Sequence, residues 1–185
     1  MEGRVLKVRQ VGDPVLFNKA EEVDLSMINK KEIKQIIEDL KETMFYQEGC
    51  LGLAAPQIGI NKRIIVIHVD KEKCCYQDSE DIPTTVMINP KWRKLSDDMY
   101  IEYEGCASVP ELRGKVERYK NIEVTYYTEK GEKKVKKVSG FTARDIQYEC
   151  DHLDGKIFLD KVISPNGFAT KDMVKKFDLR NENNG

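Results

Sequence analysis

Apolar residues recur along the chain at two spacings, which predict both helices and strands. Between residues 29 and 47 they follow one face of an amphipathic helix, at Ile33, Ile36, Ile37, Leu40 and Met44. Residues 63–69 (RIIVIHV) are nearly all apolar and β-branched, so a buried strand is expected there. Residues 121–128 alternate apolar and polar positions, and a second strand at 133–139 follows a Lys-Gly turn, which predicts a β-hairpin.

Weaker patterns predict the remaining elements. We expect helices at residues 141–153 and 170–177, and extended segments at 6–13, at 84–89 (ending at Pro90) and at 91–103, the last with a turn. The polar, acidic residues 71–83 predict an exposed loop. Residues 49–59 (GCLGLAAPQIG) are too rich in glycine and small side chains for an ordinary surface loop, which indicates that backbone approaches a neighbour closely there.

Composition limits the organisation and the partners of the chain. Its 185 residues predict a single domain over 1–185, with a polar tail at about 180–185. The 31 basic and 32 acidic residues leave a formal net charge of -1, so we expect neither sequence-specific nucleic-acid binding nor a membrane partner. The four lysines within 133–139 favour a solvated strand edge, with a nucleic-acid or ribosomal contact as the alternative. Five cysteines, an odd number, predict no disulfide framework.

The predicted helix at 141–153 carries the residues best suited to chemistry. Asp145, Tyr148, Glu149 and His152 recur at spacings of three and four and therefore share one face. A metallohydrolase helix of the HExxH kind has two histidines one turn apart and a glutamate between them. Tyr148 stands where the first of those histidines would be. The only other histidine, His68, lies in the buried strand, where a structural role is expected.

Three segments, taken in order, resemble the signature motifs of the peptide deformylase family. They are GCLGLAAPQ at 49–57, EGCAS at 104–108 and QYECDHLDG at 147–155, against the family patterns GxGxAAxQ, EGCLS and HExDH. The resemblance implies an α+β fold with mixed or antiparallel sheets around a central helix that carries the third motif. It also implies hydrolytic removal of the formyl group from N-formylmethionine of nascent polypeptides by a metal-bound water.

The resemblance implies a role for each matching residue. The metal would be Fe²⁺, with Zn²⁺ or Ni²⁺ as substitutes, held by Cys106 and His152 with Tyr148 at the third ligand position. Glu149 would be the general base and acid of the hydrolysis. The remaining residues would contact the substrate: Gln57 and the backbone N–H of Ala107 as oxyanion donors, and Leu51, Gly52 and Asp145 as parts of the substrate site. Asp151 would form a structural ion pair with Arg113.

Four positions depart from the family pattern. Cys50 replaces the first glycine of the first motif, and Ala107 replaces a leucine but still supplies its backbone N–H. Tyr148 matters most, because a phenol with a pKa of about 10 is a poor ligand for a divalent ion. Asp145 places a carboxylate where the family lines its methionine pocket with a small or apolar residue, and the alternative is a solvated residue near the helix N-terminus.

These residues leave three functions open. The first is a deformylase with an altered metal site, acting on an N-formylmethionyl peptide or a nascent chain, with the ribosome as a further partner. The second is a metal-free, catalytically weak or inactive protein that binds peptide N-termini. The third is a thiol hydrolase with Cys106 as nucleophile, His152 as base and Gln57 as oxyanion donor. By the same resemblance, the protein would work in the bacterial cytoplasm or in an organelle.

Overall fold

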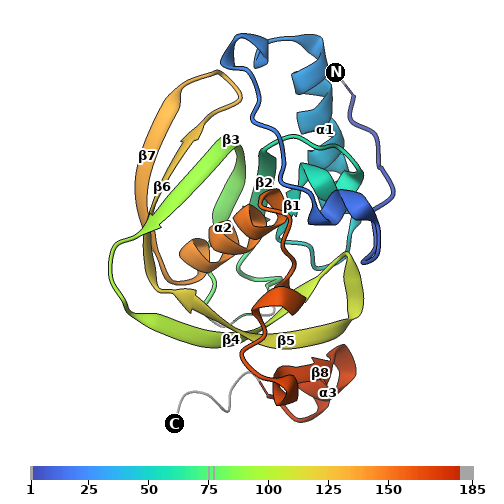
Figure 1. Cartoon of the computed structure of the whole chain (residues 1–185), viewed down its shortest axis with the longest axis vertical. Helices are drawn as coiled ribbons and strands as arrows, with labels where there is room; N and C mark the ends of the chain where they lie inside the picture. Colours follow the sequence, from blue (N-terminus) through green and yellow to red (C-terminus); the bar gives the residue numbers. More distant parts are fainter. Residues whose placement is uncertain (1, 75, 77, 180–185) are drawn as a thin grey trace.

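The computed structural model describes residues 2–74, 76 and 78–179, and its elements form two antiparallel sheets and three α-helices (Figure 1). The helices are α1 (Lys31–Tyr46), α2 (Gly140–Leu153) and α3 (Lys171–Lys176), and the strands are β1 (Gly52–Ala54), β2 (Ile64–Val69), β3 (Ile82–Lys94), β4 (Met99–Cys106), β5 (Val109–Tyr119), β6 (Asn121–Tyr127), β7 (Lys133–Ser139) and β8 (Phe168–Thr170). One sheet has the order β1-β2-β3-β6-β7 and the other β4-β5-β8. The predicted tail at 180–185 lies outside the described residues.

The two long helices cover opposite faces of the five-stranded sheet. Ile64 and Val66 of β2 pack into a core shared with α1, whereas Ile65 and Ile67 pack into a core shared with α2. Successive side chains of a strand point to opposite faces, so a strand covered on both sides must be apolar at every position. This explains why residues 64–67 are all apolar and gives the expected α+β arrangement, with α2 in the middle of the molecule (Figure 1).

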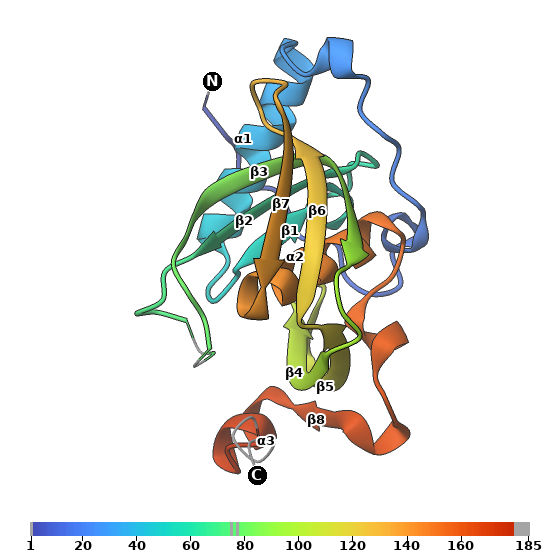
Figure 2. The same cartoon turned by 90° about the vertical axis from the view of Figure 1, so that its left-hand side faces the viewer.

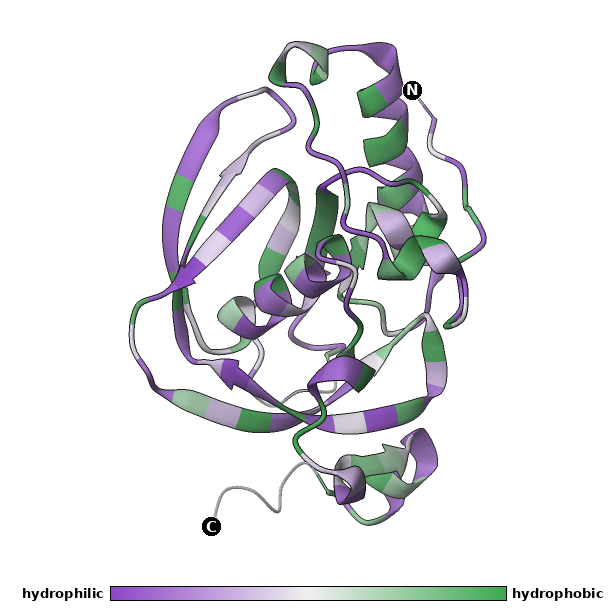
Figure 3. Ribbon diagram, viewed as in Figure 1, coloured by the Kyte–Doolittle hydropathy of each residue, from purple (hydrophilic) through white to green (hydrophobic). Residues whose placement is uncertain are grey.

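Most of the predicted elements are confirmed. Helices α1, α2 and α3 fall within one or two residues of the predicted ranges, and β6 pairs with β7 as a hairpin. Strand β7 has a hydrogen-bonded neighbour on one side only, so its lysines do lie on a sheet edge, and Figure 3 shows this strand as mostly hydrophilic. In the described part of the chain, no helix is long and apolar enough to cross a membrane.

Strand β3 continues past Pro90, contrary to the expected end at that residue. The pairing of β3 with β6 shifts register between Ile88 and Lys91, and Asn89 has a φ of 52°. A bulge of this kind accommodates proline, which has no N–H to give to a ladder. The Asn89 side chain holds the bulge by accepting a hydrogen bond from the Val23 N–H and donating one to the Val23 carbonyl, both at 2.8 Å.

Strand β5 was not predicted, because its buried positions do not form an apolar pattern. The inward-facing residues are Gly114, Val116 and Arg118, of which only one is a typical core side chain. Its partner β4 ends at Cys106, which stands opposite Val109 across the turn. The β4–β5 hairpin therefore carries the EGCAS segment at its tip, and Figure 2 shows the hairpin between α2 and the C-terminal elements β8 and α3.

The N-terminal segment joins two of the three motif segments. The Arg9 N–H donates to the Gln57 carbonyl at 2.7 Å, and two residues later the Val11 N–H donates to the Ser108 carbonyl at 2.9 Å. Residues at i and i+2 of an extended segment point the same way, so one short stretch bonds both neighbours. The predicted extended segment at 6–13 thus holds the first motif next to the second.

A buried arginine ties the β4–β5 hairpin to α2. Arg118 binds both carboxylate oxygens of Glu104, at 2.9 and 2.8 Å, and its remaining Nη donates to Asp151 on α2. All three side chains are buried: those of Arg118 and Glu104 are 4% exposed, and that of Asp151 is 11% exposed. Arg118 is consequently the residue that fixes the hairpin against the helix.

The expected ion pair between Asp151 and Arg113 is wrong. Arg113 lies five positions before Arg118 on β5, and an odd separation along a strand places two side chains on opposite faces. The Arg113 Nη1 donates instead to the carbonyls of Pro110 and Leu112, at 2.9 and 2.7 Å. Both arginines belong to β5, but only Arg118 faces the helix.

Replacing Arg118 by methionine should destabilise the protein by roughly 3–5 kcal/mol, because it leaves Glu104 without its counter-charge and Asp151 with only the Lys161 ammonium, at 3.9 Å. Chemical denaturation at neutral pH measures the change in the free energy of unfolding. Arg113→Met is the matched control from the same strand and should cost less than about 1 kcal/mol, since its hydrogen bonds go to neighbouring carbonyls at the surface. Equal losses in the two variants would contradict the assigned pairing.

Candidate active site

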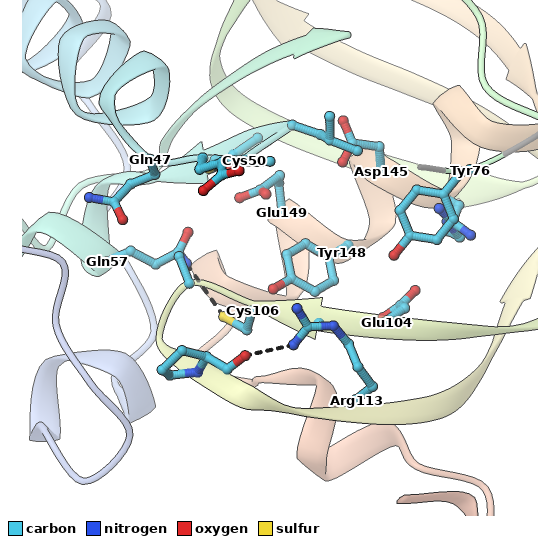
Figure 4. A pocket seen from close by; sticks show the side chains of 18 of the residues that line it. Gln47, Cys50, Gln57, Tyr76, Glu104, Cys106, Arg113, Asp145, Tyr148 and Glu149 are labelled. Atoms are coloured by element: carbon cyan, nitrogen blue, oxygen red, sulfur yellow. Dashed lines mark hydrogen bonds between the residues drawn. The ribbon is translucent and has the colours of Figure 1, made fainter. Parts of the chain in front are cut away.

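A cavity of about 250 Å³ opens where the three motif segments meet (Figure 4). Its walls come from the segment after α1, from the tip of the β4–β5 hairpin and from one face of α2. The residues predicted for the site that line it are Leu51, Gly52, Gln57, Cys106, Ala107, Asp145, Tyr148 and Glu149. His152 is fully buried behind Cys106 and does not line the cavity. The fold therefore brings together all the predicted site residues.

The side-chain amide of Gln57 has a fixed orientation. Its Oε1 accepts a hydrogen bond from the Ala54 N–H at 2.9 Å, so its Nε2 must point the other way. That nitrogen lies 3.6 Å from the Cys106 sulfur and 3.4 Å from the Ser108 hydroxyl oxygen. Gln57 is buried, and the short 3₁₀ turn Ala55–Ile58 holds its backbone. A preorganised N–H donor thus faces the Cys106 side of the cavity.

The glycine at position 52 makes room for Glu149. A Cβ atom at Gly52 would lie 2.6 Å from Glu149 Oε1, so any side chain there would displace the Glu149 carboxyl from its place. This is the close backbone approach predicted for residues 49–59. Since β1 runs alongside α2, the Glu149 carboxylate lies directly over the strand backbone, and Figure 4 shows it projecting toward the cavity between Cys50 and Tyr148.

Cys106 and His152 are placed as two ligands of one metal ion would be. The Cys106 sulfur and His152 Nε2 are 3.5 Å apart. A tetrahedral ion with bonds of about 2.3 Å to sulfur and about 2.0–2.1 Å to nitrogen would hold the two atoms at roughly that separation. Burial, with a smaller effect of Arg118, lowers the pKa of His152 to about 3, so the imidazole is neutral and able to act as a ligand.

Tyr148 occupies the third position of this group. Its ring packs edge-on against the His152 ring with centroids 5.0 Å apart, and its hydroxyl interacts with the Cys106 sulfur (Figure 4). Burial, together with Cys106 and Glu149, raises the pKa of the Tyr148 phenol well above its usual value. Among the described residues, no three histidine, cysteine, aspartate or glutamate side chains converge as a metal site. Two donors fit a metal, and the third is a neutral phenol.

Burial also opposes ionisation of the thiol. It raises the pKa of Cys106, and the hydrogen bond from Tyr148 only partly offsets the rise. A protonated thiol is a weak nucleophile. This counts against the thiol hydrolase among the functions left open by the sequence.

Two carboxyl groups on α2 share the cavity. Burial first, and the neighbouring Asp145 and Glu104 next, raise the pKa of Glu149 well above its usual value. Burial likewise raises the pKa of Asp145 to about 7, although the Arg144 charge opposes the rise. Asp145 is only 8% exposed, so the alternative of a solvated residue near the helix start is wrong.

The sequence alone did not point to Arg144 or Tyr76. Arg144 is 4% exposed and lines the cavity, with its guanidinium 3.9 Å from the centre of the Tyr76 ring and 4.7 Å from that of Phe141. Tyr76 belongs to the segment 71–83, predicted as an exposed loop, yet it lines the cavity and packs on Phe141. The signal in the sequence that could have pointed to Arg144 is its place beside Asp145 on a helix whose neighbouring residues are buried.

His68 and the described cysteines behave as expected. The His68 ring packs against Phe45 with centroids 5.1 Å apart, and its Nδ1 lies 3.3 Å from the Thr84 hydroxyl, so it is not among the cavity residues. Cys50, Cys74, Cys106 and Cys150 carry free thiols, and Cys75 lies outside the described residues.

Asp145→Asn should stabilise the protein more at pH 8 than at pH 4. The folded protein keeps a proton on Asp145 up to about pH 7, whereas the unfolded chain releases it near pH 4, so wild-type stability falls relative to the asparagine variant across this window. The difference should reach a few kcal/mol, at about 1.4 kcal/mol per unit of pKa shift. Denaturation curves at the two pH values measure it, with the exposed Asp98→Asn as control. A pH-independent difference would contradict this account of Asp145.

Solved structures of known proteins share this architecture. A peptide deformylase from Acinetobacter baumannii with Met-Ala-Ser bound superimposes with a TM-score of 0.79 at 34% identity, over 86% of this chain and 99% of that one. The peptide deformylase of Thermotoga maritima gives a TM-score of 0.75 at 34% identity, over 88% of this chain and 99% of that one.

Sequence comparisons give the same family. The polypeptide deformylase family model matches residues 5–167, which include every residue of the site. Peptide deformylase 1A, chloroplastic/mitochondrial, of Arabidopsis thaliana is 42% identical over 169 residues, and this chain spans 62% of its length. Peptide deformylase 1 of Bordetella pertussis is 37% identical over 167 residues, which cover 90% of this chain and 93% of that protein. The fold, the three motifs and these relatives together establish that the chain belongs to the peptide deformylase family.

Proposed function

We propose that this chain binds formylated peptide N-termini in the cavity and removes the formyl group by hydrolysis, at a rate limited by Tyr148. The observation that carries the proposal is the convergence of Gln57, Cys106, Glu149 and His152 on one cavity. The substrate would be an N-formylmethionyl peptide or a nascent chain. In support, a relative of the same fold has been crystallised with Met-Ala-Ser bound.

Cys106 and His152 would hold the metal, which by family resemblance is Fe²⁺, with Zn²⁺ or Ni²⁺ as substitutes. Their separation supports this assignment. A divalent ion there would supply Lewis-acid polarisation, which is worth several kcal/mol of transition-state stabilisation. Tyr148 makes the ligand set incomplete, because a phenol must lose its proton before it binds strongly. We therefore expect weak metal affinity in this chain.

The protein groups would act on the two ends of the formamide. The Gln57 Nε2 and the Ala107 N–H would donate hydrogen bonds to the formyl oxygen, where negative charge develops. Glu149 would accept a proton from the attacking water and deliver it to the leaving amine. The raised pKa of Glu149 suits the second of these steps, because it favours the protonated carboxyl that delivers a proton to the amine.

A second candidate function is metal-free binding of peptide N-termini. The observation that favours it is the packing of the Tyr148 ring on His152, which fills space beside the two remaining ligands. In that case Gln57 and Glu149 would hold the peptide end without turnover.

Tyr148→His should restore a third nitrogen ligand and raise the metal content of the purified protein from well below one equivalent to about one. Formate release from formyl-Met-Ala-Ser should rise by about two to three orders of magnitude in kcat/KM, as expected for a metal contribution of several kcal/mol. Elemental analysis and a formate assay measure the two effects.

Tyr148→Phe is the matched control, because it keeps the ring and removes only the hydroxyl, so neither metal content nor activity should rise. A wild-type protein that already carries a full equivalent of metal would contradict the role given to Tyr148. Tight binding of the formyl peptide with no formate release, in wild type and in Tyr148→His alike, would favour the second candidate function.

A further inference from the structure

In the described part of the chain, three side chains of α2 that line the cavity have a buried polar atom without a hydrogen-bond partner, and one of them, Glu149, already has a part in the proposed hydrolysis. Among the described residues, neither Asp145 Oδ2 nor Arg144 Nη1 has a partner, although both atoms are buried. The two side chains are 8% and 4% exposed, and both line the cavity. Neither has a part in the hydrolysis proposed above. Buried polar groups are nearly always paired, with protein or with water, so unpaired ones that line a cavity are available to hydrogen-bond a ligand that enters it.

Asp145 lies within reach of a substrate side chain. It precedes Glu149 by four residues on the same helix face, a separation of about 6 Å along the helix axis. Figure 4 shows Asp145 between Glu149 and Tyr76, and we call this end of the cavity, lined by Asp145, Arg144 and Tyr76, its inner end. A peptide whose first residue binds beside Glu149 and Gln57 would place an unbranched side chain of four or so atoms at Asp145.

The two unpaired groups require different hydrogen-bonding partners. The Asp145 carboxylate needs a donor, and the Arg144 guanidinium can only donate and needs an acceptor. A carboxamide carries a donor and an acceptor on one small planar group and has no charge. A thioether would leave both groups without a partner, an ammonium would face the Arg144 charge, and a carboxylate would face the Asp145 charge.

We propose that the inner end of the cavity accepts a first side chain that ends in a carboxamide, as glutamine does, in preference to the apolar side chain of methionine. Glutamine and methionine have unbranched side chains of similar length, so the preference comes from hydrogen bonding and not from a difference in shape. This inference rests on the proposed function only in that a peptide N-terminus binds beside Glu149.

The test compares four peptides that differ only in the first residue. Dissociation constants are measured by calorimetry for formyl-Gln-Ala-Ser, formyl-Met-Ala-Ser, formyl-Lys-Ala-Ser and formyl-Glu-Ala-Ser with the full chain at pH 8, above the pKa of Asp145. The glutamine peptide should bind at least about 10-fold more tightly than each of the others, which corresponds to about 1.4 kcal/mol. Equal or tighter binding of the methionine, lysine or glutamate peptide overturns the inference.

Variants assign the preference to the two residues. Asp145→Leu should reverse the order of the glutamine and methionine peptides, and the exposed Glu32→Leu, which removes a carboxylate far from the cavity, should leave it unchanged. Arg144→Met gives an independent variant should Asp145→Leu fail to fold, and it should reduce the glutamine preference. An unchanged preference in folded variants at both positions overturns the assignment.

The two levels of the proposal fail in different ways. If folded wild-type protein binds none of the four peptides, the proposed function is wrong, and this inference falls with it. If the methionine peptide binds as well as or better than the glutamine peptide, the proposed function stands and only the side-chain preference is wrong.

Discussion

The buried contact of Arg118 with Glu104 and Asp151 is the constraint on which the site depends. Glu104 lies two residues before Cys106 on β4, and Asp151 lies immediately before His152 on α2. One guanidinium therefore fixes the spacing of the two segments that bring sulfur and imidazole to 3.5 Å. Because a buried ion pair is weak evidence of stability but strongly destabilising when one partner is removed, this contact makes the hairpin and the helix dependent on each other.

The sequence predicted best those elements whose signal lies in residues close together along the chain. The β2 run and the α1 stripe are local patterns, and both elements were predicted correctly. The three motif segments could be brought to one site because their resemblance to a family supplied contacts that no local pattern contains. Strand β5 was missed because its inward face carries Gly114 and Arg118, so burial there is polar and long-range. The predicted partner of Asp151 was wrong for the same reason, because whether Arg113 or Arg118 faces α2 depends on which side chains of β5 point inward.

The side chains that shape the inner end of the cavity were harder to predict than those with a proposed catalytic role. Gln57 and Glu149 have particular types at particular spacings. Arg144 stacks on Phe141 of the same helix and on Tyr76, which belongs to a segment predicted as a loop. The contact with Tyr76 joins residues that are distant in sequence, so it leaves no period in the sequence itself.

Tyr148 and Asp145 change the charge balance of the cavity in the same direction. A divalent ion favours the ionised forms of thiol and carboxyl groups around it, whereas a neutral phenol adds no positive charge. The Arg144 charge then acts on the Asp145 carboxyl and the Arg118 charge on the Glu149 carboxyl, and the pKa of each stays raised because these charges do not fully offset burial. A neutral ligand rich in hydrogen-bonding groups suits this wall of the cavity better than an apolar or a charged one. The two departures, three residues apart on one helix face, thus bear on the proposed catalysis and the proposed recognition through the same electrostatic environment.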